Sequence, residues 1–173
     1  MIELELHQLE LRYASLRLSI AGRRARLAAS IMEHGQQSPV LVVPEAERYV
    51  LIDGYARVEA LRSLGRDLVS ATVLDLSEAE ALVLSYRLER GRRRSVLEEA
   101  WLIAELVERH GKSQRELALQ LGRSPSWISR HLALARHVPE EVEEAVRRGT
   151  VCAHAAMKHL VPLARANTEA CRQ

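Results

Sequence analysis

The chain of 173 residues is poor in cysteine, in aromatic side chains and in excess charge of either sign. Its two cysteines, Cys152 and Cys171, leave the first 151 residues without a thiol and lack a metal-ligand spacing, which excludes a disulfide framework or a cysteine-rich zinc site as the organising element. No apolar run approaches the ~20 residues of a membrane span, and the start does not have the pattern of a signal peptide. We therefore expect a cytoplasmic protein with no membrane partner.

The net charge is only +2, which excludes a general basic field around the molecule. Any attraction for nucleic acid must therefore come from local clusters of arginine. Hydrophobic residues make up 47% and charged residues 28% of the chain, as in ordinary globular proteins that fold by themselves. The length allows one domain or two small ones.

The first part of the chain alternates strand-like and helix-like patterns. Apolar residues at period two predict strands from Ile2 to Leu6 and from Val69 to Val73, and two apolar runs around the polar segment PEAER predict a hairpin. Helical spacing predicts two helices, one from Arg23 to Glu33 that includes Met32 in its apolar series and one after Gly54. Residues 1–80 are therefore expected to form a small α/β domain.

The remainder of the chain shows helix starts and no strand pattern. Capping boxes, in which a serine and a glutamate three residues later satisfy free backbone amides, are expected at Ser77, Ser95 and Ser113. Further helices are expected in the segments EEVEEAVRR and AHAAMKHL. Residues 81–173 are thus predicted to form an all-helical domain, and the fold class is α+β.

The stretch SQRELALQLGRSPSWISRHLAL, residues 113–134, contains two helix starts close together. Gly122 ends the first helix, and Ser124 with Pro125 begins the second. Two helices joined by so short a turn cross steeply, which requires a small residue at the crossing, here Ala118, and an apolar residue that packs back, here Ile128. This spacing predicts a helix-turn-helix over residues 113–135.

Side chains of this motif suit DNA recognition. Arg130 can pair with guanine in the major groove, and short serines allow close approach to base edges and phosphates. Between residues 110 and 137 only Glu116 is acidic. The predicted DNA-binding residues are Lys112, Gln114, Arg115, Arg123, Ser124, Ser126, Ser129 and Arg130.

Two features of the motif have a second interpretation. The two helices could be a helical hairpin without a DNA-binding role, since such hairpins are common. Trp127 could stack on DNA, but packing against the neighbouring helix is the more frequent use of an aromatic residue at such a position.

Beyond these local patterns, the segments SIMEHGQQSPVLVV, YVLIDGYARVEALRSLG and ISRHLALARHVPEEVEEAVRRGTV, in this order, resemble the ParB partition-protein family over nearly the whole chain. The resemblance implies a ParB/sulfiredoxin-like α/β N-terminal domain followed by a helical DNA-binding domain. It also implies CTP binding with Mg²⁺ in the first domain, which closes as a clamp on DNA. We do not expect dimerisation through the family's usual C-terminal domain, so self-association through the N-terminal domain is the expected alternative.

Carried over residue by residue, the first family box keeps Gly35 and Pro39, and the second keeps Gly54 and Arg57. Tyr55 and Ala56 replace a glutamate and an arginine of the second box, and the Glu-Asn pair of the third is absent from RLERGRRRSVLEEA. Arg90 and its neighbouring arginines could replace metal charge at a triphosphate, touch DNA phosphates or form a solvated basic linker. The nucleotide-binding residues implied are Gly35, Pro39, Gly54, Arg57 and Arg90.

The sequence therefore predicts a nucleoid-associated protein that reads a specific duplex site, in DNA partition, in transcriptional control or in a mobile element. We expect no catalytic residues, no protein metal ligands and at most weak CTPase activity. Sulfiredoxin chemistry is excluded because no cysteine lies near Gly54, and a nuclease is disfavoured because His34, Asp53, Glu59 and Asp75 are scattered. The alternative is a nucleotide-dependent enzyme, an NTPase or kinase on the same fold.

Overall fold

The computed structural model describes residues 1–18, 21–89, 94–148, 150–152, 155 and 159. It divides the chain into two compact units, Met1–Leu88 and Glu89–Gln173. The boundary expected at residue 80 falls inside α3 (Glu78–Leu88), which packs against strands of the first unit. The capping box at Ser77 therefore begins a helix that covers the sheet, rather than the first helix of the helical unit.

The first unit is built on a five-stranded mixed sheet in the order β1-β5-β3-β4-β2. Its strands are β1 (Ile2–Glu5), β2 (Leu9–Glu10), β3 (Val40–Glu45), β4 (Arg48–Asp53) and β5 (Leu68–Val73). The predicted hairpin of β3 and β4 is present and antiparallel, with Val43 opposite Val50. β3 runs parallel to β5, and β1 runs antiparallel to β5, which places the first strand of the chain at one edge of the sheet.

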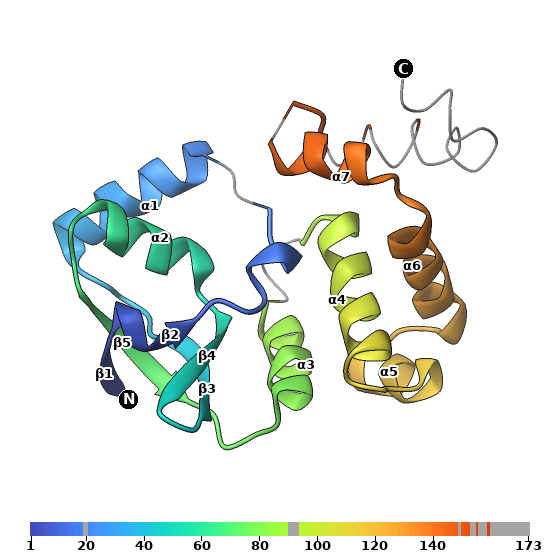
Figure 1. Cartoon of the computed structure of the whole chain (residues 1–173), viewed down its shortest axis with the longest axis horizontal. Coiled ribbons are helices and arrows are strands. Elements are labelled where there is room, and N and C mark those ends of the chain that lie inside the picture. Colours follow the sequence, from blue (N-terminus) through green and yellow to red (C-terminus); the bar gives the residue numbers. More distant parts are fainter. Residues whose placement is uncertain (19–20, 90–93, 149, 153–154, 156–158, 160–173) are drawn as a thin grey trace. The chain divides into compact units, whose positions relative to one another are not determined.

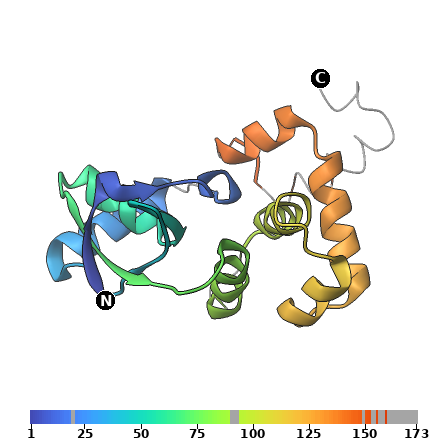
Figure 2. The same ribbon diagram turned by 60° about the horizontal axis from the view of Figure 1, so that its bottom comes forward.

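Helices α1 (Ala21–His34) and α2 (Tyr55–Ser63) lie side by side in this unit (Figures 1 and 2). Apolar residues of β3 and β4 form the centre of the core, where Val40, Val42 and Leu51 are completely buried together with Val58 of α2. The single-turn 3-10 helix η1 (Leu6–Gln8) lies between β1 and β2, and η2 (Ala14–Leu16) lies between β2 and α1.

Two expectations for the first unit are wrong in detail. β1 ends at Glu5, because the chain turns into η1 at Leu6, although Leu6 is buried as expected. Met32 has the helical spacing of the apolar face of α1 but is 69% exposed. Ile31, which belongs to the same apolar series, is buried.

The second unit contains α4 (Val96–Glu108), α5 (Gln114–Leu121), α6 (Pro125–His137) and α7 (Glu140–Arg147). α6 packs against both α4 and α5. The core of this unit is formed by large buried side chains from three of these helices: Leu97, Leu102, Ile103, Leu106, Leu117 and Ile128. The helix expected in AHAAMKHL lies largely outside the described residues.

The capping boxes expected at Ser77 and Ser95 are present, with the serine and the glutamate bonded reciprocally. The box expected at Ser113 is incomplete. The Ser113 hydroxyl accepts the Glu116 amide at 3.2 Å, but the Glu116 carboxylate is bonded to Lys112 instead, because that ammonium group lies one helical turn away. None of the described helices is both long and apolar enough to cross a membrane.

Candidate functional site

The predicted helix-turn-helix is formed by α5, the turn at Gly122 and α6. Gly122 has φ +62°, the left-handed conformation that favours glycine, and the Arg123 amide closes the end of α5 on the Ala118 carbonyl at 2.9 Å. The Ser124 hydroxyl then caps α6 by accepting the Trp127 amide at 3.2 Å. Ala118 and Ile128 are buried, as the motif requires. The local signals read from the sequence therefore produce the expected geometry.

The predicted DNA-binding residues lie around the exposed N-terminal half of α6 and on α5. Ser126, Ser129 and Arg130 of α6 are exposed, as are Gln114 and Arg115 of α5. Within the described part of the chain, Arg115 and Arg130 make no hydrogen bond or ion pair. Both guanidinium groups are thus available for an anionic ligand.

The other members of the predicted set are engaged within the protein. Lys112 is half-buried and its ammonium group lies 2.6 Å from the Glu116 carboxylate, which holds the pKa of Glu116 below its usual value. The Ser124 hydroxyl is used by the helix cap. Arg123 is exposed but lies over the ring of Trp127, with its guanidinium carbon 4.8 Å from the ring centroid. Trp127 is half-buried.

A second candidate site lies in the first unit, where β3 and β4 end beside the start of α2. Gly54 precedes α2 with φ +109°, and an added Cβ would lie 2.5 Å from the Cγ1 atom of Val40. No side chain fits at this position. Gly54 therefore lets the start of α2 approach β3 closely, which brings the two predicted family boxes together.

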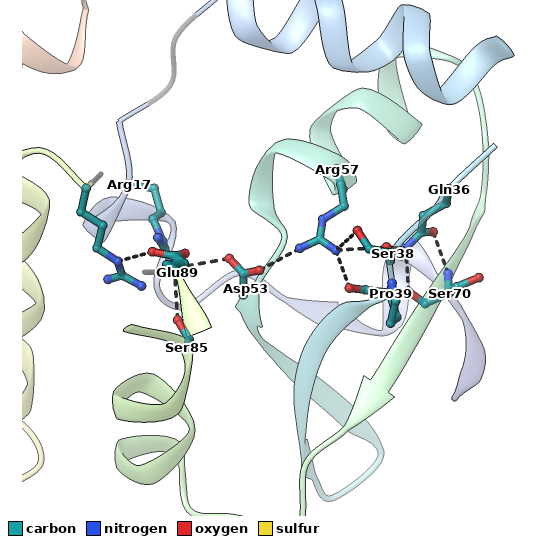
Figure 3. A network of polar contacts seen from close by, with 10 residues as sticks. Arg17, Gln36, Ser38, Pro39, Asp53, Arg57, Ser70, Ser85 and Glu89 are labelled. Carbon is teal, nitrogen blue, oxygen red and sulfur yellow. Dashed lines mark hydrogen bonds and ion pairs between the residues drawn. The ribbon is translucent and has the colours of Figure 1, made fainter. Parts of the chain in front are cut away.

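Arg57 connects the two boxes. Its guanidinium donates to the Asp53 carboxylate at 2.7 Å, to the Ser38 carbonyl at 3.0 Å and to the carbonyl of Pro39 (Figure 3). Arg17 approaches the other oxygen of Asp53 at 3.6 Å. The corner of Arg17, Asp53 and Arg57 is largely buried, with two arginines around one carboxylate at the N-terminus of a helix. Such a positive surrounding favours an anionic ligand.

Gln36 holds the first box against β5. Its side-chain amide donates to the carbonyls of Ser38 at 2.9 Å and Ser70 at 2.8 Å, and its oxygen accepts the Ser70 amide at 2.9 Å (Figure 3). Gly35 ends α1 with φ +70°, and its amide bonds to Ile31 at 2.9 Å. The structure thus brings Pro39, Gly54 and Arg57 together, with Gly35 leading into the same loop.

The predicted arginine cluster is described only in part. Arg90, together with residues 91–93, lies outside the described residues. Arg94 is paired with Glu89, and Arg87 is exposed near the end of α3. The described residues contain no group of three or more histidine, cysteine or acidic side chains that could hold a metal ion.

Tyr55, which stands where the family has a glutamate, is a buried structural residue rather than a surface group. Its hydroxyl donates to the Leu51 carbonyl at 2.6 Å and accepts the Tyr13 amide at 3.1 Å. Burial raises the pKa of the Tyr55 phenol above its ordinary value. The folded state therefore binds the phenolic proton more tightly than the unfolded state does.

This sets an expected alkaline limit for the first unit. A tyrosine in the unfolded chain has a pKa of about 10. The contribution of Tyr55 to the free energy of unfolding is therefore fully present below that pH, and it falls as the pH rises toward the raised pKa of the folded state. Urea unfolding of the full chain at roughly pH 8 to 11 should show this loss. Tyr55→Phe should be less stable by about 1 kcal/mol at neutral pH but decline less steeply. Tyr49→Phe, which removes a tyrosine hydroxyl at another position of the same unit, is the control. A decline equally steep in Tyr55→Phe would contradict the assignment.

Comparison with known families identifies both domains of the chain. Residues 3–87 match the family model of the ParB N-terminal domain, and residues 93–171 match the model of the ParB HTH domain. The chain belongs to the ParB family. The predicted ParB resemblance and α+β fold class are therefore confirmed, and the helix-turn-helix lies in the family's HTH domain.

Two curated ParB-family relatives illustrate the match. The nucleoid occlusion protein of Bacillus licheniformis is 37% identical over 142 residues, which cover 79% of this chain and 49% of the relative. The chromosome-partitioning protein Spo0J of Thermus thermophilus is 37% identical over 129 residues, which cover 73% of this chain and 47% of the relative. The chain spans about half the length of these relatives.

A solved ParB structure shares the fold. The C-terminally truncated ParB of Caulobacter crescentus, complexed to the centromeric parS site, is 23% identical with a TM-score of 0.50, and the match covers 98% of this chain and 92% of that one. This likeness concerns the fold alone.

The sequence did not predict the contributions of Arg17 and Gln36 to the ParB N-terminal domain, because no local spacing links either residue to its distant partners.

Proposed function

We propose that this chain is a ParB-type DNA-binding protein that recognises a specific duplex site through α6. The observation that carries the proposal is the exposed N-terminal half of α6, where Ser126, Ser129 and Arg130 follow a capped turn within the HTH domain. Short hydroxyl side chains beside an available guanidinium match the donors that read base edges in the major groove.

The charge of the motif supports the same function. Between residues 110 and 137 the single acidic residue, Glu116, is paired with Lys112. Arg115 and Arg130 are then a surplus of positive charge on exposed positions, and Arg123 adds a third exposed guanidinium that also faces Glu99 of α4. Such a surplus attracts the phosphate backbone and makes binding depend on salt.

A pair of substitutions distinguishes base reading from backbone contact. Arg130→Ala is expected to weaken binding to the preferred duplex by about 1–3 kcal/mol and to relax sequence preference, because the lost contact is to a base edge. Arg123→Ala should weaken binding to all duplexes alike, because its expected contact is to phosphate. Fluorescence anisotropy at several salt concentrations measures both effects.

The control for these variants is Arg148→Ala, since Arg148 is an exposed arginine at the C-terminal cap of α7 and is paired with Glu144 at 3.0 Å. Arg148→Ala should bind the preferred duplex and other duplexes as the parent chain does. Unchanged duplex binding by Arg130→Ala at every salt concentration would refute the base-reading role.

We infer further that the corner of Pro39, Gly54 and Arg57 binds a nucleotide phosphate, with CTP the expected nucleotide in this family. The start of α2, approached closely by β3, offers backbone amides, and Arg17 and Arg57 supply positive charge. When bound, CTP would supply the triphosphate that these groups neutralise. The described residues do not fit a protein site for Mg²⁺, because both oxygens of Asp53 face arginines.

Binding of radiolabelled CTP, ATP and GTP, with and without Mg²⁺ and duplex DNA, tests the second inference. Selective CTP binding supports it, and the release of phosphate in the same samples measures turnover, which we expect to be weak. DNA binding without binding of any nucleotide would overturn the nucleotide inference and leave the DNA proposal intact.

The biological setting that we propose is partition of a chromosome or plasmid at the nucleoid. The names of the two relatives, a nucleoid occlusion protein and a chromosome-partitioning protein, support this setting over control of transcription. Self-association through the N-terminal unit stays a prediction, tested by sedimentation with and without CTP and duplex DNA.

A further inference from the structure

Four side chains form a chain of contacts between α4 and the first half of α6. Glu99 comes from α4, Arg123 from the turn before α6, and Trp127 and His131 from α6 itself. His131 is only 8% exposed, whereas the side chain of Arg123 is 45% exposed. The contacts between the four residues therefore extend from the buried His131 to the exposed Arg123.

His131 connects α6 to α4 through both ring nitrogens. Its Nδ1 lies 2.9 Å from the Trp127 carbonyl, which can only accept, so Nδ1 carries a hydrogen. Its Nε2 lies 3.5 Å from Oε2 of Glu99, and a carboxylate also only accepts. His131 thereby contacts its own helix through Nδ1 and faces the Glu99 carboxylate of α4 through Nε2.

The same carboxylate also reaches the surface. Oε1 of Glu99 lies 4.0 Å from Nη2 of Arg123, and the Arg123 guanidinium lies 4.8 Å from the centroid of Trp127. The ring of Trp127 in turn lies against His131, with centroids 3.7 Å apart. Arg123 is thus held between a carboxylate and an aromatic face, which restricts an otherwise flexible side chain.

We propose that Glu99 and His131 are positioning residues for DNA recognition, which hold Arg123, just before the start of α6, in the geometry that meets the duplex. This rests on the proposed DNA-binding function. An arginine already ordered in the free protein loses less conformational freedom on binding, so affinity rises without any new contact to DNA.

Shortening the carboxylate without changing its charge tests the role. Glu99→Asp moves the carboxylate oxygens away from Arg123 and His131. It leaves the net charge of the protein, and therefore its overall electrostatic interaction with DNA, unchanged. We expect its affinity for a duplex selected by the parent chain to fall on the order of fivefold. The matched control is Glu108→Asp, since Glu108 also lies on α4 and pairs with Arg136 of α6 at 2.9 Å, but on the exposed surface. It should bind as the parent does.

A double-mutant cycle separates positioning from general loss of structure. In the Arg123→Ala background, Glu99→Asp should lose most of its effect, because the residue through which it acts is gone. A purely structural role for Glu99 would give the same fold-loss in both backgrounds and would overturn the proposal, as would equal affinities of Glu99→Asp and the parent. Absence of duplex binding by the parent itself would overturn the proposed function, which makes the two failures distinguishable.

Discussion

Replacing Gly54 with alanine is expected to lower the unfolding free energy of the N-terminal unit by about 3 kcal/mol or more. Two costs combine at this position. The backbone has φ +109°, which side-chain-bearing residues rarely adopt, and the new Cβ would lie 2.5 Å from Cγ1 and 2.9 Å from Cβ of Val40. Val40 is completely buried at the centre of the sheet and cannot move aside without disturbing the core.

Gly65→Ala is the matched control for this substitution. Gly65 also has a positive φ, +64°, but an added Cβ there would meet no atom within 4 Å. It should therefore lose only about 1 kcal/mol, from the backbone alone. Urea unfolding of the full chains compares the two. Equal losses would show that the close approach of β3 to the start of α2 is not what requires glycine.

Arg57→Met is expected to destabilise the same unit by about 2–3 kcal/mol. The substitution keeps much of the apolar stem but removes the donors to Asp53, Ser38 and Pro39. Within the described residues, the Asp53 carboxylate, whose side chain is 22% exposed, then keeps only the more distant Arg17. The loop that carries the first box would lose its connection to α2.

The control for Arg57→Met is Arg24→Met. Arg24 also lies close to a carboxylate, that of Glu59 at 3.5 Å, but both side chains are more than 40% exposed. Its loss should stay within about 0.5 kcal/mol, because solvent-exposed ion pairs contribute little. Thermal unfolding of both variants provides the comparison. A stability of Arg57→Met equal to that of Arg24→Met would contradict the connecting role of Arg57.

Features set by neighbouring residues were predictable from the sequence. The end of α5 at Gly122 and the start of α6 at Ser124 and Pro125 depend on local backbone chemistry, and the structure has both where the sequence places them. The hairpin of β3 and β4 follows equally from two short apolar runs. The two-residue strand β2 is too short to show any periodicity, and no pattern predicted it.

Features that depend on distant residues were not predictable in the same way. Arg57 was identified through the family resemblance, but its bonds to Ser38 and Pro39 cross 19 and 18 residues and have no signal in the spacing. The contact of Glu99 with His131 joins two helices on either side of α5. Such contacts exist only once the helices pack, so sequence patterns alone do not contain them.

The most direct test of the account is selection of duplexes from a random-sequence pool by the full chain and by Arg130→Ala. The account predicts that the parent chain enriches one defined sequence and that Arg130→Ala enriches a more degenerate one, with at least one guanine position relaxed. Enrichment of no sequence by the folded parent chain, or of the same sequence with equal stringency by the variant, would contradict the claim that α6 reads DNA.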